Sequence, residues 1–142
     1  MNLWFSDNPT ALATYGNIVD WDTSRVTNMR NAFKSKTTFN SDISKWDVSN
    51  VVTLSCMFGR TDYPPDNYEL NANLSAWQVG KVTDMSYMFA GIKFNGDLSK
   101  WDVSNVKTMY SMFGTDVGRK FFIDGSVVGP LCQRLLQTTS FG

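Results

Sequence analysis

One motif of thirteen residues occurs four times in this chain of 142 residues. The copies read WDTSRVTNMRNAF, WDVSNVVTLSCMF, WQVGKVTDMSYMF and WDVSNVKTMYSMF. They begin at four tryptophans, 25, 31 and 24 residues apart, and end at four phenylalanines: Trp21, Trp46, Trp77 and Trp101, then Phe33, Phe58, Phe89 and Phe113. A period of this length predicts a repeat protein, in which each copy buries its apolar face only against its neighbours.

The apolar residues of each repeat suggest two short elements. We count positions from the tryptophan, so that +8 is the eighth residue after it. Apolar side chains at +5, +8, +11 and +12 have the spacing of one helix face. An aliphatic residue at −3, between polar residues at −4 and −2, has the alternation of a strand. The sequence therefore predicts an α/β fold, a leucine-rich-repeat-like solenoid of about four coils, each a short parallel strand plus a short helix. The four tryptophans and four phenylalanines form its predicted core.

Three segments follow from where the repeat begins and ends. Residues 1–14 do not match it and are predicted to be an N-terminal cap or a degenerate coil. Residues 15–114 form the four-coil solenoid. The long second spacing predicts a loop insertion near 60–69, where Pro64 and Pro65 are typical of a surface loop. Residues 115–142 lack the pattern and are predicted to be a non-repeat C-terminal tail or cap.

Composition excludes several classes of function. Thirteen basic residues balance thirteen acidic ones, so no net field attracts nucleic acid. The chain has no histidine, and therefore lacks the commonest general base and zinc ligand. Cys56 and Cys132 can be free thiols or can form one disulfide bridge, and the sequence does not distinguish these alternatives. No apolar run is long enough to predict membrane insertion, and the N-terminus has no signal-peptide pattern. We find no catalytic motif, and predict neither an enzyme nor a cofactor.

The predicted strands bring polar residues together at −4 and −2. On a parallel sheet these side chains would line the concave face, on which solenoids usually bind proteins. The candidate ligand-binding residues are Asn17, Asp42, Ser44, Asn73, Ser75, Asp97 and Ser99. The simpler interpretation is that they are solvated strand positions. A carboxylate pair such as Asp42 and Asp97 would belong to a repeated ladder, which argues against glycosidase chemistry.

A second polar row lies at +1 and contains Asp22, Asp47, Gln78 and Asp102. Stacked carboxylates can bind calcium, but aspartate also accepts hydrogen bonds from backbone amides in its own turn. We favour the turn because Gln78 interrupts the row, so no metal site is predicted. Asn73-Leu74-Ser75 is a glycosylation sequon that matters only in a secreted eukaryotic chain.

The central repeats resemble a known family. The segments FNSDISKWDVSNVVTLSCMF, from Phe39, and FNGDLSKWDVSNVKTMYSMF, from Phe94, resemble the BspA-like leucine-rich-repeat surface proteins. The resemblance covers about residues 15–114 and weakens in the third copy, at Gln78 and Gly80. It implies an extracellular or cell-surface location, a protein or cell-surface ligand, and no enzymatic activity.

Two hypotheses of function follow. The first is a non-catalytic surface repeat module for protein–protein interaction or adhesion. The alternative is a structural spacer segment of a longer surface repeat array, with no ligand of its own.

Overall fold

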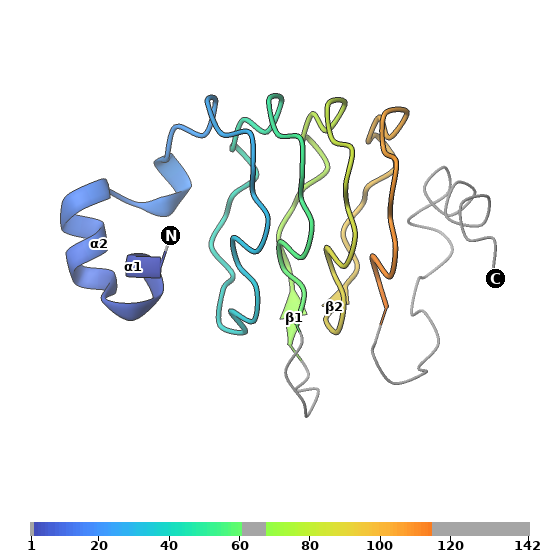
Figure 1. Cartoon of the computed structure of the whole chain (residues 1–142). Coiled ribbons are helices and arrows are strands. Elements are labelled where there is room, and N and C mark those ends of the chain that lie inside the picture. Colours follow the sequence, from blue (N-terminus) through green and yellow to red (C-terminus); the bar gives the residue numbers. More distant parts are fainter. Residues whose placement is uncertain (1, 61–67, 115–142) are drawn as a thin grey trace.

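A computed structural model describes residues 2–60 and 68–114, and Figure 1 shows their arrangement. Two helices lie at one end, and the repeats stand side by side next to them. The elements are α1 (Asn2–Ser6), α2 (Asn8–Tyr15), a 3-10 turn (Ile18–Asp20), β1 (Glu69–Leu70) and β2 (Lys93–Phe94). Part of the predicted loop, residues 61–67, and the predicted tail, residues 115–142, lie outside the described residues.

Backbone hydrogen bonds join each repeat to the next. Position +7 forms parallel bridges through all four repeats, in the order Asn28, Thr53, Asp84 and Thr108. The N–H groups at +8, +10 and +12 donate to the carbonyls at +7, +9 and +11 of the following repeat, over 2.8 to 3.1 Å. The N–H at +6 donates in the opposite direction, as from Val52 to the carbonyl of Thr27 at 2.8 Å. A ladder therefore runs along the described repeats at the positions where we expected a helix.

The predicted helix at +5 to +12 is wrong for all four repeats, which are described over these positions. The residue at +10 has a positive φ of 47° to 59° in every copy: Asn31, Cys56, Tyr87 and Ser111. An L-residue in this left-handed region cannot continue a right-handed helix. The i, i+3 spacing of apolar residues instead reflects a tight turn, closed in the second repeat by the Met57 N–H on the Leu54 carbonyl at 3.0 Å.

The predicted strand at −4 to −2 is also replaced by a turn. In the second repeat, the Asp42 side chain accepts from the Ser44 N–H at 2.9 Å, and the Trp46 N–H donates to the Ile43 carbonyl at 3.1 Å. A short polar side chain that accepts from the amide two residues later stabilises a turn and competes with strand pairing. Alternation over only three residues did not distinguish the two. The leucine-rich-repeat solenoid class stays a prediction.

Each repeat is thus a series of capped turns with the apolar side chains between them pointing inward. The phenylalanines at +12 form a stack through all four repeats, with successive ring centroids 5.5, 5.7 and 5.4 Å apart. Trp46, Trp77 and Trp101 are buried, whereas Trp21, at the N-terminal end of the stack, is partly exposed. Burying a side chain of this kind stabilises the fold by about 1.5–3 kcal/mol.

The two helices cover part of the first repeat. Trp4 of α1 meets Trp21 edge-on at 5.8 Å, and Phe5 meets Phe33 at 6.0 Å. α2 begins after Asp7, whose side chain accepts from the Thr10 N–H at 3.2 Å and thereby caps the helix. The described part of this segment, residues 2–14, is therefore mostly helical and packs on the aromatic side of repeat 1.

Candidate functional site

The predicted ligand-binding residues occupy one row of turns. In every repeat the side-chain oxygen at −4 accepts a hydrogen bond from the backbone N–H at −2. The pairs are Asn17–Val19 at 3.3 Å, Asp42–Ser44 at 2.9 Å, Asn73–Ser75 at 3.1 Å and Asp97–Ser99 at 2.9 Å. The −4 side chains are exposed, as is Ser99, while Ser44 and Ser75 are partly exposed. The structure brings these residues into equivalent places on successive repeats, but on turns and not on strands. We call them the turn row.

The tryptophans fix the spacing of this row. The indole N–H of each buried tryptophan donates to the carbonyl at −3 of the preceding repeat: Trp46 to Ile18 at 2.9 Å, Trp77 to Ile43 at 3.1 Å and Trp101 to Leu74 at 2.9 Å. The acceptor residue lies between the −4 and −2 positions of the turn row. Neighbouring turns are therefore held in register by a buried side chain behind them.

Electrostatics make the acidic members of the turn row weak candidates for catalysis. The hydrogen bond from the Ser44 side chain, followed by that from its backbone, lowers the pKa of Asp42. The backbone of Ser99 is the main cause of a similarly lowered pKa at Asp97. Both carboxylates are exposed, and the hydrogen bonds that lower the pKa outweigh the opposing effect of desolvation, so neither carboxylate is held in the protonated form that general acid catalysis requires. They can instead present fixed negative charge to a partner.

The second polar row, at +1, stabilises the next turn in three of the four repeats. Asp22, Asp47 and Asp102 accept from the N–H of the serine two residues later at 3.0, 2.9 and 3.0 Å. These bonds use the carboxylates in the way that the turn interpretation requires. Within residues 2–60 and 68–114 no group of three His, Cys, Asp or Glu side chains is placed to hold a metal ion.

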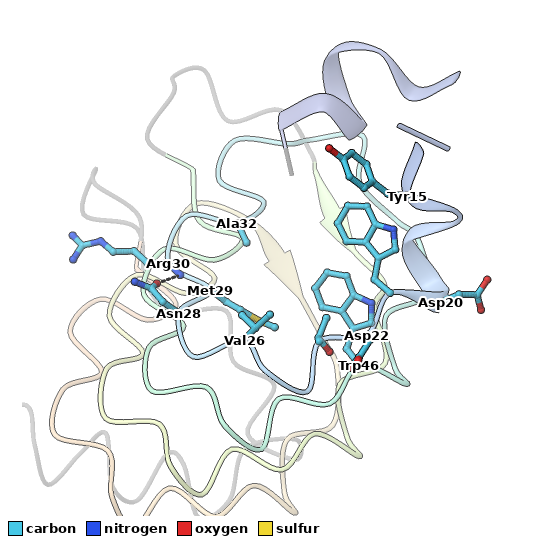
Figure 2. A pocket seen from close by; sticks show the side chains of 11 residues that line it. Tyr15, Asp20, Asp22, Val26, Asn28, Met29, Arg30, Ala32 and Trp46 are labelled. Carbon is cyan, nitrogen blue, oxygen red and sulfur yellow. Dashed lines mark hydrogen bonds between the residues drawn. The ribbon is translucent and has the colours of Figure 1, made fainter. Parts of the chain in front are cut away.

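A groove of about 770 Å³ lies at the N-terminal end of the stack, a site that our sequence reasoning missed. Figure 2 shows Trp46 along one side and Arg30 with Asn28 on the other. Its lining combines apolar and charged residues: Tyr15, Asp20, Trp21, Asp22, Thr23, Val26, Asn28, Met29, Arg30, Ala32 and Trp46. One signal was present in the sequence. Position +11 holds alanine in the first repeat, at Ala32, and methionine in the other three.

Stacked copies of one motif, joined by a backbone ladder and carrying exposed rows of capped turns, define a repeat protein. The chain belongs to the family described as Mycoplasma protein of unknown function, DUF285, which matches residues 1–117. No curated protein and no solved structure matches the chain. Among the described residues, no helix is long and apolar enough to cross a membrane.

Proposed function

We propose that this chain is a non-catalytic, BspA-like surface module that binds a protein or cell-surface ligand through its turn row. The observation that carries the proposal is the repetition of one exposed hydrogen-bonded turn in register on four repeats. Each turn is closed by its own hydrogen bond, while the side chains at −4 and −1 are exposed and those at −2 are at least partly exposed. A partner would then meet a surface that is ordered before binding, which lowers the entropic cost of association.

The charges of the turn row define the kind of partner. Asp42 and Asp97 alternate with the amide side chains of Asn17 and Asn73, and Lys45 and Lys100 follow at −1. The surface therefore offers both signs of charge and many hydrogen-bonding groups. We expect a polar protein surface to dock here, with contributions from complementary charges that weaken at high salt.

A binding screen against extracellular-matrix and cell-surface proteins tests this proposal. The test variant is Ser44→Arg with Ser99→Arg, which places bulk and charge on the turn row but keeps the backbone N–H donors of both turns. The matched control is Val52→Arg with Tyr110→Arg, which adds the same charge at two exposed positions outside the turn row. We expect the wild-type chain and the control to bind, and the test variant to lose at least about tenfold in affinity.

Equal loss in both variants would show that net charge, and not the turn row, governs binding. If the folded wild-type chain binds nothing in the screen, the result favours a spacer segment of a longer surface array. Far-ultraviolet circular dichroism and a thermal melt of each variant establish that the comparison is made between folded proteins.

A further inference from the structure

The first repeat ends the described ladder with an open backbone edge. In repeats 2 to 4 the carbonyls at +7, +9 and +11 accept N–H donors from the preceding repeat. Within the described residues, the corresponding carbonyls of Asn28, Arg30 and Ala32 receive no hydrogen bond. The N–H groups of Val52, Thr83 and Lys107 each donate to the +6 carbonyl of the preceding repeat. The N–H of Thr27 has no such acceptor among the described residues. This edge therefore presents three acceptors and one donor in the register of the internal ladder.

The groove lies beside this edge. Asn28, Arg30 and Ala32 belong to its lining, together with the apolar side chains of Val26 and Met29. In Figure 2 the side chains of Val26, Met29 and Ala32 lie between Trp46 and the Asn28–Arg30 side. A methionine at +11 fills the equivalent space in the later repeats, where Met57, Met88 and Met112 are fully buried. The small side chain of Ala32 leaves room for a side chain from outside.

The helices do not close this edge. α1 covers the aromatic side of the repeat through Phe5, which contacts Phe33 and Phe39, and Lys36 lies over the Phe5 ring at 4.9 Å. Trp4 and Tyr15 both meet Trp21. These contacts lie toward the +12 end and the tryptophan end of the repeat. Asn28 and Arg30 remain exposed.

We infer that this edge binds an extended segment of a partner protein as an added parallel strand. The segment supplies N–H groups at alternate residues to the carbonyls of Asn28, Arg30 and Ala32, and a carbonyl to the N–H of Thr27. Its apolar side chains enter the groove over Val26 and Met29. The same chain repeats this interface three times internally, and main-chain pairing of this kind is a general mode of peptide recognition.

The occupant should therefore resemble the repeat itself. At each internal interface, the donor segment has an N–H at +8, +10 and +12 and apolar side chains at +8, +11 and +12. A partner segment with the pattern Met-x-x-Met-Phe has the required donors and side chains. This inference deepens the proposed function, on which it rests, because it assigns a second contact and a partner chemistry to the same binding module.

Fluorescence anisotropy with a labelled peptide tests the inference on the full chain. The probe is NVKTMYSMFG, the sequence of residues 105–114, which contains the donor pattern and no cysteine. One modified peptide carries N-methyl groups on the nitrogens of the residues equivalent to Met109 and Ser111, which face the edge. The matched control carries them on the residues equivalent to Thr108 and Tyr110. We expect the first modification to weaken binding at least about tenfold and the second to change it less than about threefold.

A protein variant gives an independent measurement. Ala32→Met places the residue of the other repeats in the groove, and we expect it to weaken peptide binding at least about fivefold. Leu12→Met, on the exposed face of α2, should leave binding unchanged. Peptide binding should also slow hydrogen exchange at the Thr27 amide, which a purely apolar contact would not do.

Three outcomes would overturn the inference: no binding at millimolar peptide, equal binding by the two N-methylated peptides, or concentration-dependent self-association of the free chain that Ala32→Met abolishes. The last would assign the edge to a second copy. A failed peptide assay leaves the turn-row comparison of Ser44→Arg/Ser99→Arg intact. Failure of the edge and failure of the proposed binding function are therefore distinguishable.

Discussion

The indole nitrogen of Trp77 donates a hydrogen bond over 3.1 Å to the carbonyl of Ile43, which lies 34 residues earlier in the sequence. Trp77 is 2% exposed, so this bond forms where water cannot replace it. The same bond recurs from Trp46 and Trp101, which explains why the tryptophan stands at one fixed place in each repeat. It joins neighbouring repeats through a side chain, in addition to the backbone ladder.

Replacing Trp77 with phenylalanine should therefore destabilise the protein by about 2–4 kcal/mol. The change removes the indole donor, leaves the Trp46 N–H as the remaining donor to the Ile43 carbonyl, and opens a small cavity. Trp21→Phe is the matched control, because the Trp21 indole donates to Gly16 over 3.3 Å at an exposed place. We expect the control to lose less than half as much stability in urea unfolding. Equal losses would show that ring volume, and not the hydrogen bond, determines the effect.

Gly59 allows two neighbouring repeats to approach. A Cβ atom at this residue would lie 2.4 Å from the carbonyl oxygen of Tyr87, which is backbone and cannot rotate away. Gly59→Ala should thus cost more than about 2 kcal/mol in unfolding free energy. Gly80→Ala is the control, since its Cβ would come no closer than 3.6 Å to the Asp102 side chain. The control should lie within about 0.5 kcal/mol of the wild type, and a comparable loss at both sites would contradict this account.

Cys56 adopts a backbone conformation that its side chain disfavours. Its φ is 54°, in the region that asparagine tolerates better than other non-glycine residues, and the first repeat has Asn31 at the same position with a φ of 59°. Cys56→Asn should stabilise the protein by about 0.5–1 kcal/mol, whereas Cys56→Val should destabilise it because a β-branched residue fits this region worst. Thermal unfolding under reducing conditions measures both. If valine is tolerated as well as asparagine, the left-handed conformation at +10 is not required.

Acid should weaken the turns. Hydrogen bonds, chiefly from the side chains of Ser24, Ser44 and Ser49, lower the pKa values of Asp22, Asp42 and Asp47 in the folded chain. Groups whose folded pKa is depressed contribute stability that is present above the unfolded pKa, about 3.9, and is lost as the pH falls through the folded value. We therefore expect the midpoint temperature of thermal unfolding to decrease once the pH is lowered below about 4. Between about pH 5.5 and 8 it should change little, because the chain has no histidine.

The matched variant for this acid effect is Asp42→Asn. Asparagine makes the same turn bond at Asn17 and Asn73, so the fold should persist while one titrating group is removed. Its unfolding midpoint should fall less steeply below pH 4 than that of the wild type. An unchanged acid slope would mean that Asp42 does not contribute to it.

The amino-acid sequence predicted the repeat and its register, because the tryptophan and phenylalanine positions recur in all four copies. Of the eight aromatic residues predicted to form the core, six are buried, whereas Trp21 and Phe113 are only partly buried. It did not predict the local elements correctly. A tight turn closed between +8 and +11 has the same apolar spacing as a helix, and only the positive φ at residues such as Tyr87 distinguishes them. The Asp-x-Ser pattern that caps turns can be seen in the sequence. However, the three residues Asp42, Ile43 and Ser44 alternate polar, apolar and polar, which is also the pattern of a strand.

The turn-row residues could be named in advance because they recur at −4 and −2. The groove could not, because it depends on which repeat lies first in the stack and on where the helices cover it. In the sequence, Ala32 is only a small residue at +11, a position that is apolar in all four repeats. Its consequence, an open space beside unoccupied carbonyls, emerges only when the direction of the ladder is known.

Tyr68 connects the chain that follows the second repeat to an earlier part of the fold. Its hydroxyl donates to the carbonyl of Phe39 over 2.8 Å, and burial raises the pKa of Tyr68 to about 12. Burial favours the neutral phenol, so the folded pKa exceeds the unfolded value of about 10. The stability from this group is therefore present below pH 10 and is lost as the pH rises toward 12.

Tyr68→Phe should remove this bond and cost about 1–2 kcal/mol at neutral pH. In a spectrophotometric titration of the folded chain, one of the five tyrosines should ionise near pH 12 in the wild type, and this step should be absent from the variant. Tyr110→Phe is the control, because Tyr110 is 64% exposed and its loss should leave the late step in place. A late step that survives in Tyr68→Phe would assign it to another tyrosine and contradict the buried Tyr68–Phe39 bond.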